Sequence, residues 1–62
     1  MNTEDKAQIY DSLIRESDIL QRTNSRLKSE YVGNIPPNIQ TQIDANNAKI
    51  ALLVGRLEDL LR

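Results

Sequence analysis

The chain of 62 residues contains no Cys, His, Phe or Trp, and Tyr10 and Tyr31 are its only aromatic residues. Without Cys, neither a disulfide framework nor a thiolate zinc site can form. Without His, the chain lacks the side chain that most often serves as a general base near neutral pH and as a transition-metal ligand. Because a single core of this size supplies little net stability, a domain without such staples usually gains stability by oligomerising.

Net charge and long apolar runs are also scarce. Eight basic and nine acidic residues give a net charge of −1, which argues against general binding to polyanions. The longest apolar stretch, residues 50–54, is far shorter than the ~20 residues that span a bilayer. Residues 1–5 are acidic where a signal peptide would be basic. We therefore expect no secretion signal, and we expect the protein in the cytoplasm, or in a virion if it comes from a phage.

A single strong break divides the chain, at residues 33–38 (GNIPPN). Gly33 suits the left-handed conformation that ends many helices, and Pro36 or Pro37 suits the first turn of the following helix. The rest of the chain has helical periodicity and no strand pattern. The sequence predicts one all-α domain over residues 1–62, with a first helix over about 3–32, a Gly-Asn-Ile-Pro-Pro turn at 33–37 and a second helix over about 37–61.

Asparagines are candidate caps at the start of both predicted helices. Asn2, with Asp5 three residues later, has the spacing of a capping box in which Asp replaces the usual Glu. Asn34 or Asn38 is placed to cap the second helix, and the pattern does not choose between them.

Apolar residues recur every seven positions in both predicted helices, which is the pattern of helices that pack along a heptad seam. If the helices fold back antiparallel, residues whose numbers sum to about 70 face each other, so that Leu20 opposes Ile50. We predict an antiparallel, heptad-patterned helical hairpin of coiled-coil type. Its expected core consists of Ile9, Leu13, Leu20, Leu27, Ile43, Ile50, Leu53, Leu57 and Leu60.

Polar residues interrupt this seam near its middle. Thr23 or Asn24 of the first helix is expected to oppose Asn46 or Asn47 of the second. Such a layer either specifies register and oligomeric state or is simply hydrated and loosely packed. Glu16 also falls at an expected core position, and we expect its long side chain to extend to solvent.

Apolar residues are in surplus at the open end of the hairpin, opposite the turn, and residues 50–54 are apolar on all sides of their helix. The surplus predicts an association surface formed by Tyr10, Ile14, Ile19, Leu52, Val54 and Leu61. Leu52→Asp is therefore expected to dissociate the oligomer with little direct damage to the seam. Gly55 weakens its helix by ~1 kcal/mol relative to Ala. It either lies at an exposed position without a role or permits close approach of another backbone.

The side chains needed for catalysis are poorly represented. Serines and threonines are present, but no His or Cys can activate or replace them. The paired acids Glu58 and Asp59 are adjacent and diverge by about 100° on a helix. The two glycines are too far apart to form a phosphate-binding loop. We expect no enzymatic activity, cofactor, metal ion or small-molecule substrate.

A basic flank of the first helix suggests an alternative function. Arg15, Arg22 and Arg26, with Lys28 nearby, are candidate contacts to nucleic acid. In architecture and length, though not in its residues, the predicted hairpin resembles the small plasmid-copy-number RNA-binding proteins that dimerise into four-helix bundles. That resemblance implies a dimeric four-helix bundle acting as a nucleic-acid-binding regulator.

Acid-first spacing of four residues favours ion pairs within a helix, which would neutralise part of this flank. The spacing predicts the pairs Asp11–Arg15, Asp18–Arg22 and Glu58–Arg62. We therefore favour a non-enzymatic structural, oligomerisation or adaptor protein. It is expected to form a homo-oligomer, with a dimeric four-helix bundle favoured, or to dock on a partner protein as a subunit of a larger assembly. Small hairpins of this type occur in phage and plasmid accessory proteins, in bacterial regulators and in secretion assemblies.

Overall fold

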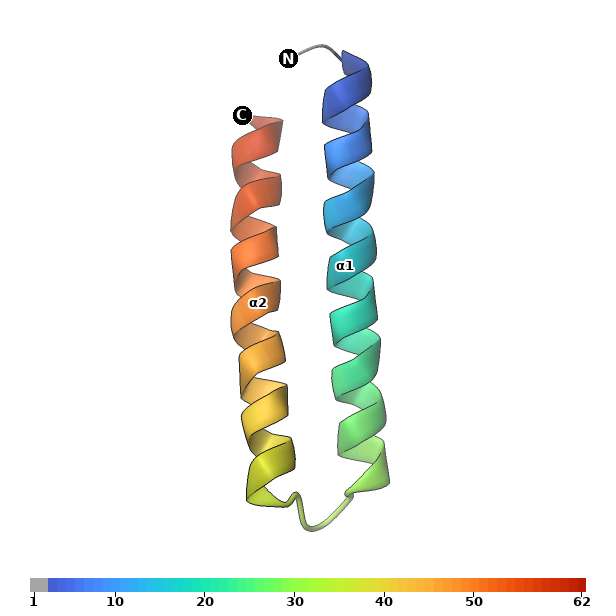
Figure 1. The fold of residues 1–62 in the computed structure, drawn as a ribbon, viewed down its shortest axis with the longest axis vertical. Helices are drawn as coiled ribbons and strands as arrows, with labels where there is room; N and C mark the ends of the chain where they lie inside the picture. Colours follow the sequence, from blue (N-terminus) through green and yellow to red (C-terminus); the bar gives the residue numbers. More distant parts are fainter. Residues whose placement is uncertain (1–2) are drawn as a thin grey trace.

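A computed structural model describes residues 3–62, which form two α-helices: α1 (Thr3–Glu30) and α2 (Pro37–Leu61). The helices lie antiparallel and side by side, with the start of α1 and the end of α2 at the same end of the molecule (Figure 1). This arrangement confirms the predicted all-α hairpin. The Cα radius of gyration is 14.5 Å, against about 10.6 Å for a compact domain of this length. The hairpin is therefore an elongated rod, and the predicted Asn2 cap lies outside the described residues.

The turn begins where α1 ends, at Glu30, two residues before the predicted boundary. The Tyr31 N–H still donates to the Leu27 carbonyl oxygen at 3.1 Å, and the Asn34 N–H then donates to the Tyr31 carbonyl oxygen at 3.2 Å. Gly33 lies within the tight turn that the Asn34–Tyr31 hydrogen bond closes, and its φ is 89°. Because that left-handed conformation disfavours residues with a Cβ, Gly33 allows the chain to reverse here.

The backbone of the two prolines, rather than an asparagine side chain, begins α2. Pro36 is the N-cap, with φ −60° and ψ 149°, and it makes no side-chain capping bond. A residue that precedes proline is restricted to this extended region, so Pro37 at the first helical position sets the N-cap geometry. The Gln40 N–H then donates to the Pro36 carbonyl oxygen at 2.9 Å. Neither Asn34 nor Asn38 caps the helix.

The two helices pack along the predicted heptad seam. The buried apolar residues are Leu13, Leu27, Ile39, Ile43 and Leu53. Four further predicted core residues are half-buried, namely Leu20, Ile50, Leu57 and Leu60. Ile9 departs from the prediction because it is 38% exposed. Ile9 lies four residues before Leu13 and lines an open hollow with Arg56, Asp59 and Leu60 of α2. Its side chain therefore lies at the edge of the seam and stays partly open to solvent.

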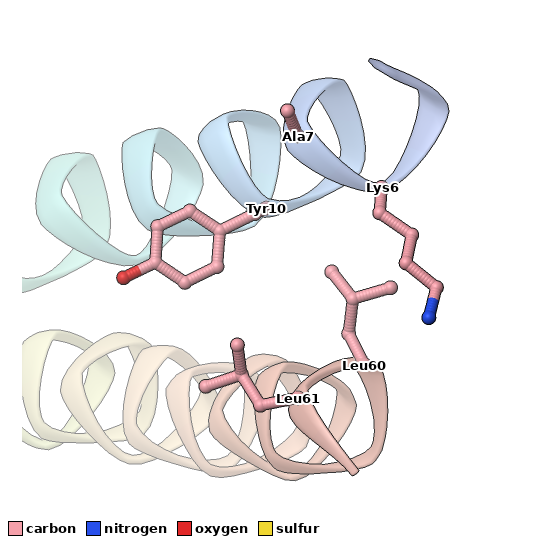
Figure 2. Close-up of a pocket in the computed structure, with 5 residues that line it drawn as sticks. All are labelled: Lys6, Ala7, Tyr10, Leu60 and Leu61. Atoms are coloured by element: carbon pink, nitrogen blue, oxygen red, sulfur yellow. The ribbon is translucent and has the colours of Figure 1, made fainter. Parts of the chain in front are cut away.

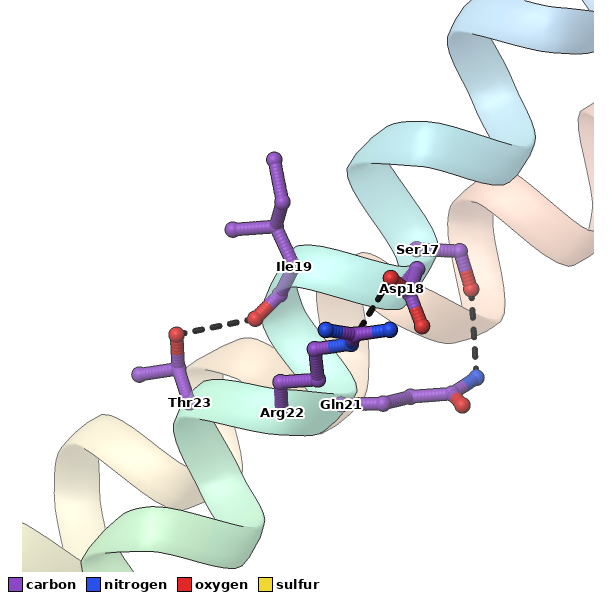
Figure 3. A network of polar contacts seen from close by, with 6 residues as sticks. All are labelled: Ser17, Asp18, Ile19, Gln21, Arg22 and Thr23. Carbon is purple, nitrogen blue, oxygen red and sulfur yellow. Dashed lines mark hydrogen bonds and ion pairs between the residues drawn. The ribbon is translucent and has the colours of Figure 1, made fainter.

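Ser17 occupies the seam position that was predicted for Glu16. Ser17 is 7% exposed, whereas Glu16 is exposed, as expected for its charged side chain. Ser17 lies four residues after Leu13 and three before Leu20, which places it on the same face as both. Its hydroxyl oxygen accepts a hydrogen bond of 3.2 Å from Gln21 Nε2 (Figure 3).

Asn24 forms the centre of the predicted polar layer and is 5% exposed. Its Nδ2 donates to Asn47 Oδ1 at 2.9 Å and to the Ile43 carbonyl oxygen at 3.5 Å, while Asn46 Nδ2 donates to its Oδ1 at 2.9 Å. Thr23 is not part of the layer, because its hydroxyl donates to the Ile19 carbonyl oxygen within α1. The layer is therefore hydrogen-bonded across the two helices.

The best-packed part of the hairpin is next to the turn. Leu27, Ile39 and Ile43 form a buried cluster there, and Tyr31 and Ile35 pack against it. The corresponding side chains at the open end, such as Leu57 and Leu60, are only half-buried. The open end therefore leaves more of its apolar surface in contact with solvent, and the candidate surfaces lie there.

Candidate protein-interaction surfaces

All of the residues predicted to form the association surface are exposed in the single hairpin. They are Tyr10, Ile14, Ile19, Leu52, Val54 and Leu61, with exposed fractions between 40% and 72%. An exposed apolar side chain alone is ordinary, so their arrangement matters more than their number. The hairpin distributes them over two opposite faces.

Tyr10 and Leu61 lie on the first of these faces and point toward each other across the gap between the helices (Figure 2). With Lys6, Ala7 and Leu60 they line an open groove of about 380 Å³. Apart from the Lys6 ammonium and the Tyr10 hydroxyl, the labelled side chains are hydrocarbon. The groove therefore presents an apolar surface to any partner.

Two more apolar residues extend this face toward the middle of the hairpin. Ile14 is four residues after Tyr10, so it is rotated only about 40° from it around α1. Val54 is seven residues before Leu61, a rotation of about 20° around α2. Tyr10, Ile14, Val54 and Leu61 thus form one patch, which we name the tyrosine face.

Ile19 and Leu52 do not belong to the tyrosine face. Ile19 is nine residues after Tyr10, which places it about half a turn away on α1. Leu52 is two residues before Val54 and is therefore about 160° away from it on α2. One predicted surface is thus divided in two, because residues close in sequence point to opposite sides of a helix.

The second face combines apolar and charged residues. One hollow of about 240 Å³ is lined by Glu16, Ile19, Leu20 and Lys49. A second, of about 430 Å³, is lined by Ile9, Leu13, Arg56, Asp59 and Leu60. Because Ile9 and Glu16 are seven residues apart, as are Lys49 and Arg56, the two hollows lie on the same side of the hairpin. We name the surface formed by Ile9, Glu16, Ile19, Lys49 and Arg56 the charged face.

The charged face was missed in the sequence, although its spacing is visible there. Lys49 and Arg56 repeat at the heptad interval, but they attract no attention until their helix is oriented. Leu52 lies at the edge of this face, since it is three residues after Lys49 and four before Arg56. The predicted association residue Leu52 is therefore a neighbour of basic side chains.

Gly55 has open space around it within the hairpin. A Cβ built at this position would meet no heavy atom within 4 Å. Within residues 3–62, no backbone segment therefore approaches residue 55 so closely that only glycine would fit. Close approach of another backbone would have to come from a second molecule.

The guanidinium groups of the predicted basic flank are each paired with an acid on their own helix. Arg15 pairs with Asp11, and Arg22 pairs with Asp18 at 2.9 Å (Figure 3), as the spacing predicts. A third pair joins Arg26 to the Glu30 carboxylate at 3.7 Å. All three pairs are exposed. Any nucleic acid that contacts one of these arginines would therefore also meet the negative charge of the paired acid. The predicted Glu58–Arg62 pair is not formed among the described residues.

Lys28 lies apart from these arginines. It is two residues after Arg26 and six after Arg22, so it is rotated around α1 by about 160° from Arg26 and about 120° from Arg22. The structure therefore brings Arg15, Arg22 and Arg26 to one side of α1 and leaves Lys28 on another.

Within residues 3–62, no group of three or more His, Cys, Asp or Glu side chains is arranged to hold a metal ion. Neither described helix has an apolar stretch long enough to cross a membrane. Comparison with known proteins finds no matching family model, no similar curated protein and no similar solved structure.

Proposed function

We propose that this protein is a non-enzymatic structural or oligomerisation protein that self-associates through the tyrosine face at the open end of its hairpin. The uncovered apolar groove between Tyr10 and Leu61 is the observation that supports this proposal. Exposed apolar patches of this kind are typical of sites where a protein binds another protein.

The surface area of the hairpin favours an oligomer. The chain exposes 4784 Å², whereas a compact monomer of 7.1 kDa exposes about 4,100 Å² by the scaling of surface area with mass. The excess, roughly 700 Å², is close to the ~800 Å² that each partner contributes to a standard interface. Pairing through one long face would bring the exposed area of each chain to the value of a compact protein.

A second copy of the chain is the partner that this patch fits best. Its four apolar residues come from both helices, Tyr10 and Ile14 from α1 and Val54 and Leu61 from α2. Two such patches placed face to face form four helices around one apolar layer, which is the arrangement of a four-helix bundle. The layer would contribute the apolar burial that the open end of one hairpin lacks.

Molar mass in solution tests the proposal, measured by light scattering after size exclusion at about 1 M salt, where attractions between exposed charges are screened. The wild-type chain is expected to be a dimer. Leu61→Asp and Ile14→Asp each place a charge in the proposed interface on a different helix, and both are expected to give monomers. Val32→Asp is the matched control, because Val32 is 81% exposed but lies in the turn.

Circular dichroism of each variant reports whether the hairpin itself still forms. A helical wild-type chain that is monomeric at high concentration would overturn self-association and favour docking on a different protein. Equal masses for Leu61→Asp and the wild-type chain would place the interface elsewhere.

A further inference from the structure

We propose that the charged face is a second self-association surface, on which another copy of the chain docks with its helices alongside and its turn at the same end. The occupant is a second copy because the charges on this face complement themselves under one symmetry. The contact is independent of the tyrosine face, and it allows assembly to continue beyond a dimer.

The two rims of the charged face carry opposite charges. Glu16 provides the negative charge on the α1 side, and Lys49 and Arg56 provide positive charge on the α2 side, where Asp59 lowers the net charge of that rim to +1. Among the described residues, Glu16, Lys49 and Arg56 take part in no ion pair within 4 Å, in contrast to the arginines opposite the seam. These three charges are therefore available to a partner.

A two-fold axis parallel to the helices brings the opposite rims together. Such an axis places α1 of one copy over α2 of the other, with residues whose numbers sum to about 70 at the same level. Glu16 then lies at the level of residue 54 of the second copy. It falls between that copy's Arg56, about 3 Å along the axis, and its Lys49, about 7 to 8 Å along it in the other direction. Symmetry repeats the same contact on the other side of the interface.

The other face-to-face symmetry produces repulsion. A two-fold axis perpendicular to the helices places α1 over α1 and α2 over α2. Glu16 then approaches its own copy, and the basic rim of Lys49 and Arg56 lies over the same basic rim. Because juxtaposed like charges disfavour a contact, the charge pattern selects the parallel axis and with it the orientation of the turn.

Apolar side chains between the rims supply the contact area. Ile9 and Ile19 are 38% and 59% exposed, and the half-buried Leu20 and Leu60 also line the two hollows. Exposed ion pairs contribute only about 0 to 1 kcal/mol each. The charges therefore select the orientation and the partner, while burial of these apolar groups contributes most of the affinity.

The assembly that follows is a row of hairpins. The tyrosine face and the charged face lie on opposite sides of the plane that contains α1 and α2, so each copy can contact a neighbour on either side. At about 0.05 M salt, where exposed charges attract over a Debye length of more than 10 Å, the wild-type chain is expected to exceed the mass of a dimer. At about 1 M salt it is expected to return to a dimer.

Charge reversal in a Leu61→Asp background isolates the charged face, since that background lacks the proposed tyrosine-face contact. Leu61→Asp alone is expected to form dimers at low salt. Adding Glu16→Lys makes both rims basic, and adding Lys49→Glu with Arg56→Glu makes both rims acidic. Each of these variants is expected to be monomeric alone, and an equimolar mixture is expected to regain the dimer mass.

The mixture also excludes general attraction between oppositely charged proteins. Leu61→Asp lowers the net charge of −1 by one and Glu16→Lys raises it by two, so the basic-rim variant is neutral overall. Circular dichroism of each variant shows whether repulsion within one hairpin unfolds it, and the mixing test uses only folded variants at a temperature where both are helical.

A mixture no heavier than its components would overturn the proposed contact, as would a wild-type chain that never exceeds a dimer at low salt. At about 1 M salt, a lower molar mass of Leu61→Asp than of the wild-type chain reports on the tyrosine face alone. The two proposals therefore fail separately: the salt-resistant step tests the tyrosine face, and the salt-sensitive, mixing-dependent step tests the charged face.

Discussion

Asn46 of α2 donates a hydrogen bond of 2.9 Å from its side-chain amide to the Oδ1 of Asn24 on α1. Asn24 in turn donates to Asn47 and to the Ile43 carbonyl oxygen, so one buried amide is held by three residues of the opposite helix. The layer lies between the well-packed turn end and the more open half of the hairpin. Its hydrogen bonds connect the two helices where an apolar layer would otherwise continue.

Substitution of Asn24 separates the hydrogen bonds from the packing. Asn24→Ala removes all three bonds and leaves a space in the seam, so it is expected to lower the free energy of unfolding by about 1–3 kcal/mol. Asn24→Leu is expected to be nearly neutral or stabilising. It fills the space, and Asn46 and Asn47 are sufficiently exposed to bind water instead. Chemical denaturation at one fixed protein concentration measures both, and an equal loss in the two variants would show that the bonds themselves stabilise the fold.

Ser17 is expected to be a site of easy stabilisation. Ser17→Ala removes one hydrogen bond from Gln21, an exposed side chain that water can satisfy. The substitution also removes a buried hydroxyl, leaves a methyl group in the seam and improves helix propensity. The expected gain is about 0.5 kcal/mol, seen as a higher thermal midpoint. A lower midpoint would mean that the Gln21–Ser17 bond contributes more than its exposure indicates.

The two glycines are expected to respond in opposite directions to the same change. Gly33→Ala forces a Cβ onto a residue with φ of 89° and is expected to destabilise the hairpin by about 1–2 kcal/mol. Gly55→Ala meets open space within a helix and is expected to stabilise it by about 0.5–1 kcal/mol. Thermal unfolding compares the two. If Gly55→Ala instead lowers the molar mass while the helices remain intact, a backbone of another copy approaches this residue.

Neutralising the acids of the basic flank tests the nucleic-acid alternative. The wild-type chain is expected to show no gel shift with single- or double-stranded RNA or DNA at about 0.15 M salt, because its arginines carry paired acids into the contact. Asp11→Asn with Asp18→Asn frees Arg15 and Arg22 and is expected to introduce weak, salt-sensitive binding. Binding by the wild-type chain that is lost in Arg15→Ala with Arg22→Ala would support the regulator function instead.

The sequence was sufficient for the fold because the heptad signal is repeated many times along both helices. Ile9 was assigned to the core although it is exposed, and this single error did not change the predicted fold. The break at Gly33 and Pro37 fixed the direction of the second helix, since a short turn leaves two helices of similar length only an antiparallel arrangement. The ion pairs Asp11–Arg15 and Asp18–Arg22 were also predictable, because they depend on spacing within one helix.

The division of the exposed residues required the tertiary structure. Leu52 and Val54 are both apolar and nearly adjacent, and the sequence placed them in one surface. A rotation of about 100° per residue sends them to opposite sides of α2, but which sides these are depends on where the seam lies. Ser17 shows why the position of the seam is difficult to predict. A serine carries no hydrophobic signal, so the seam position that Ser17 occupies was assigned to the preceding residue, Glu16. Composition and spacing therefore determined the hairpin, and only the packing of α1 on α2 decided which side chains face each other and which remain for a partner.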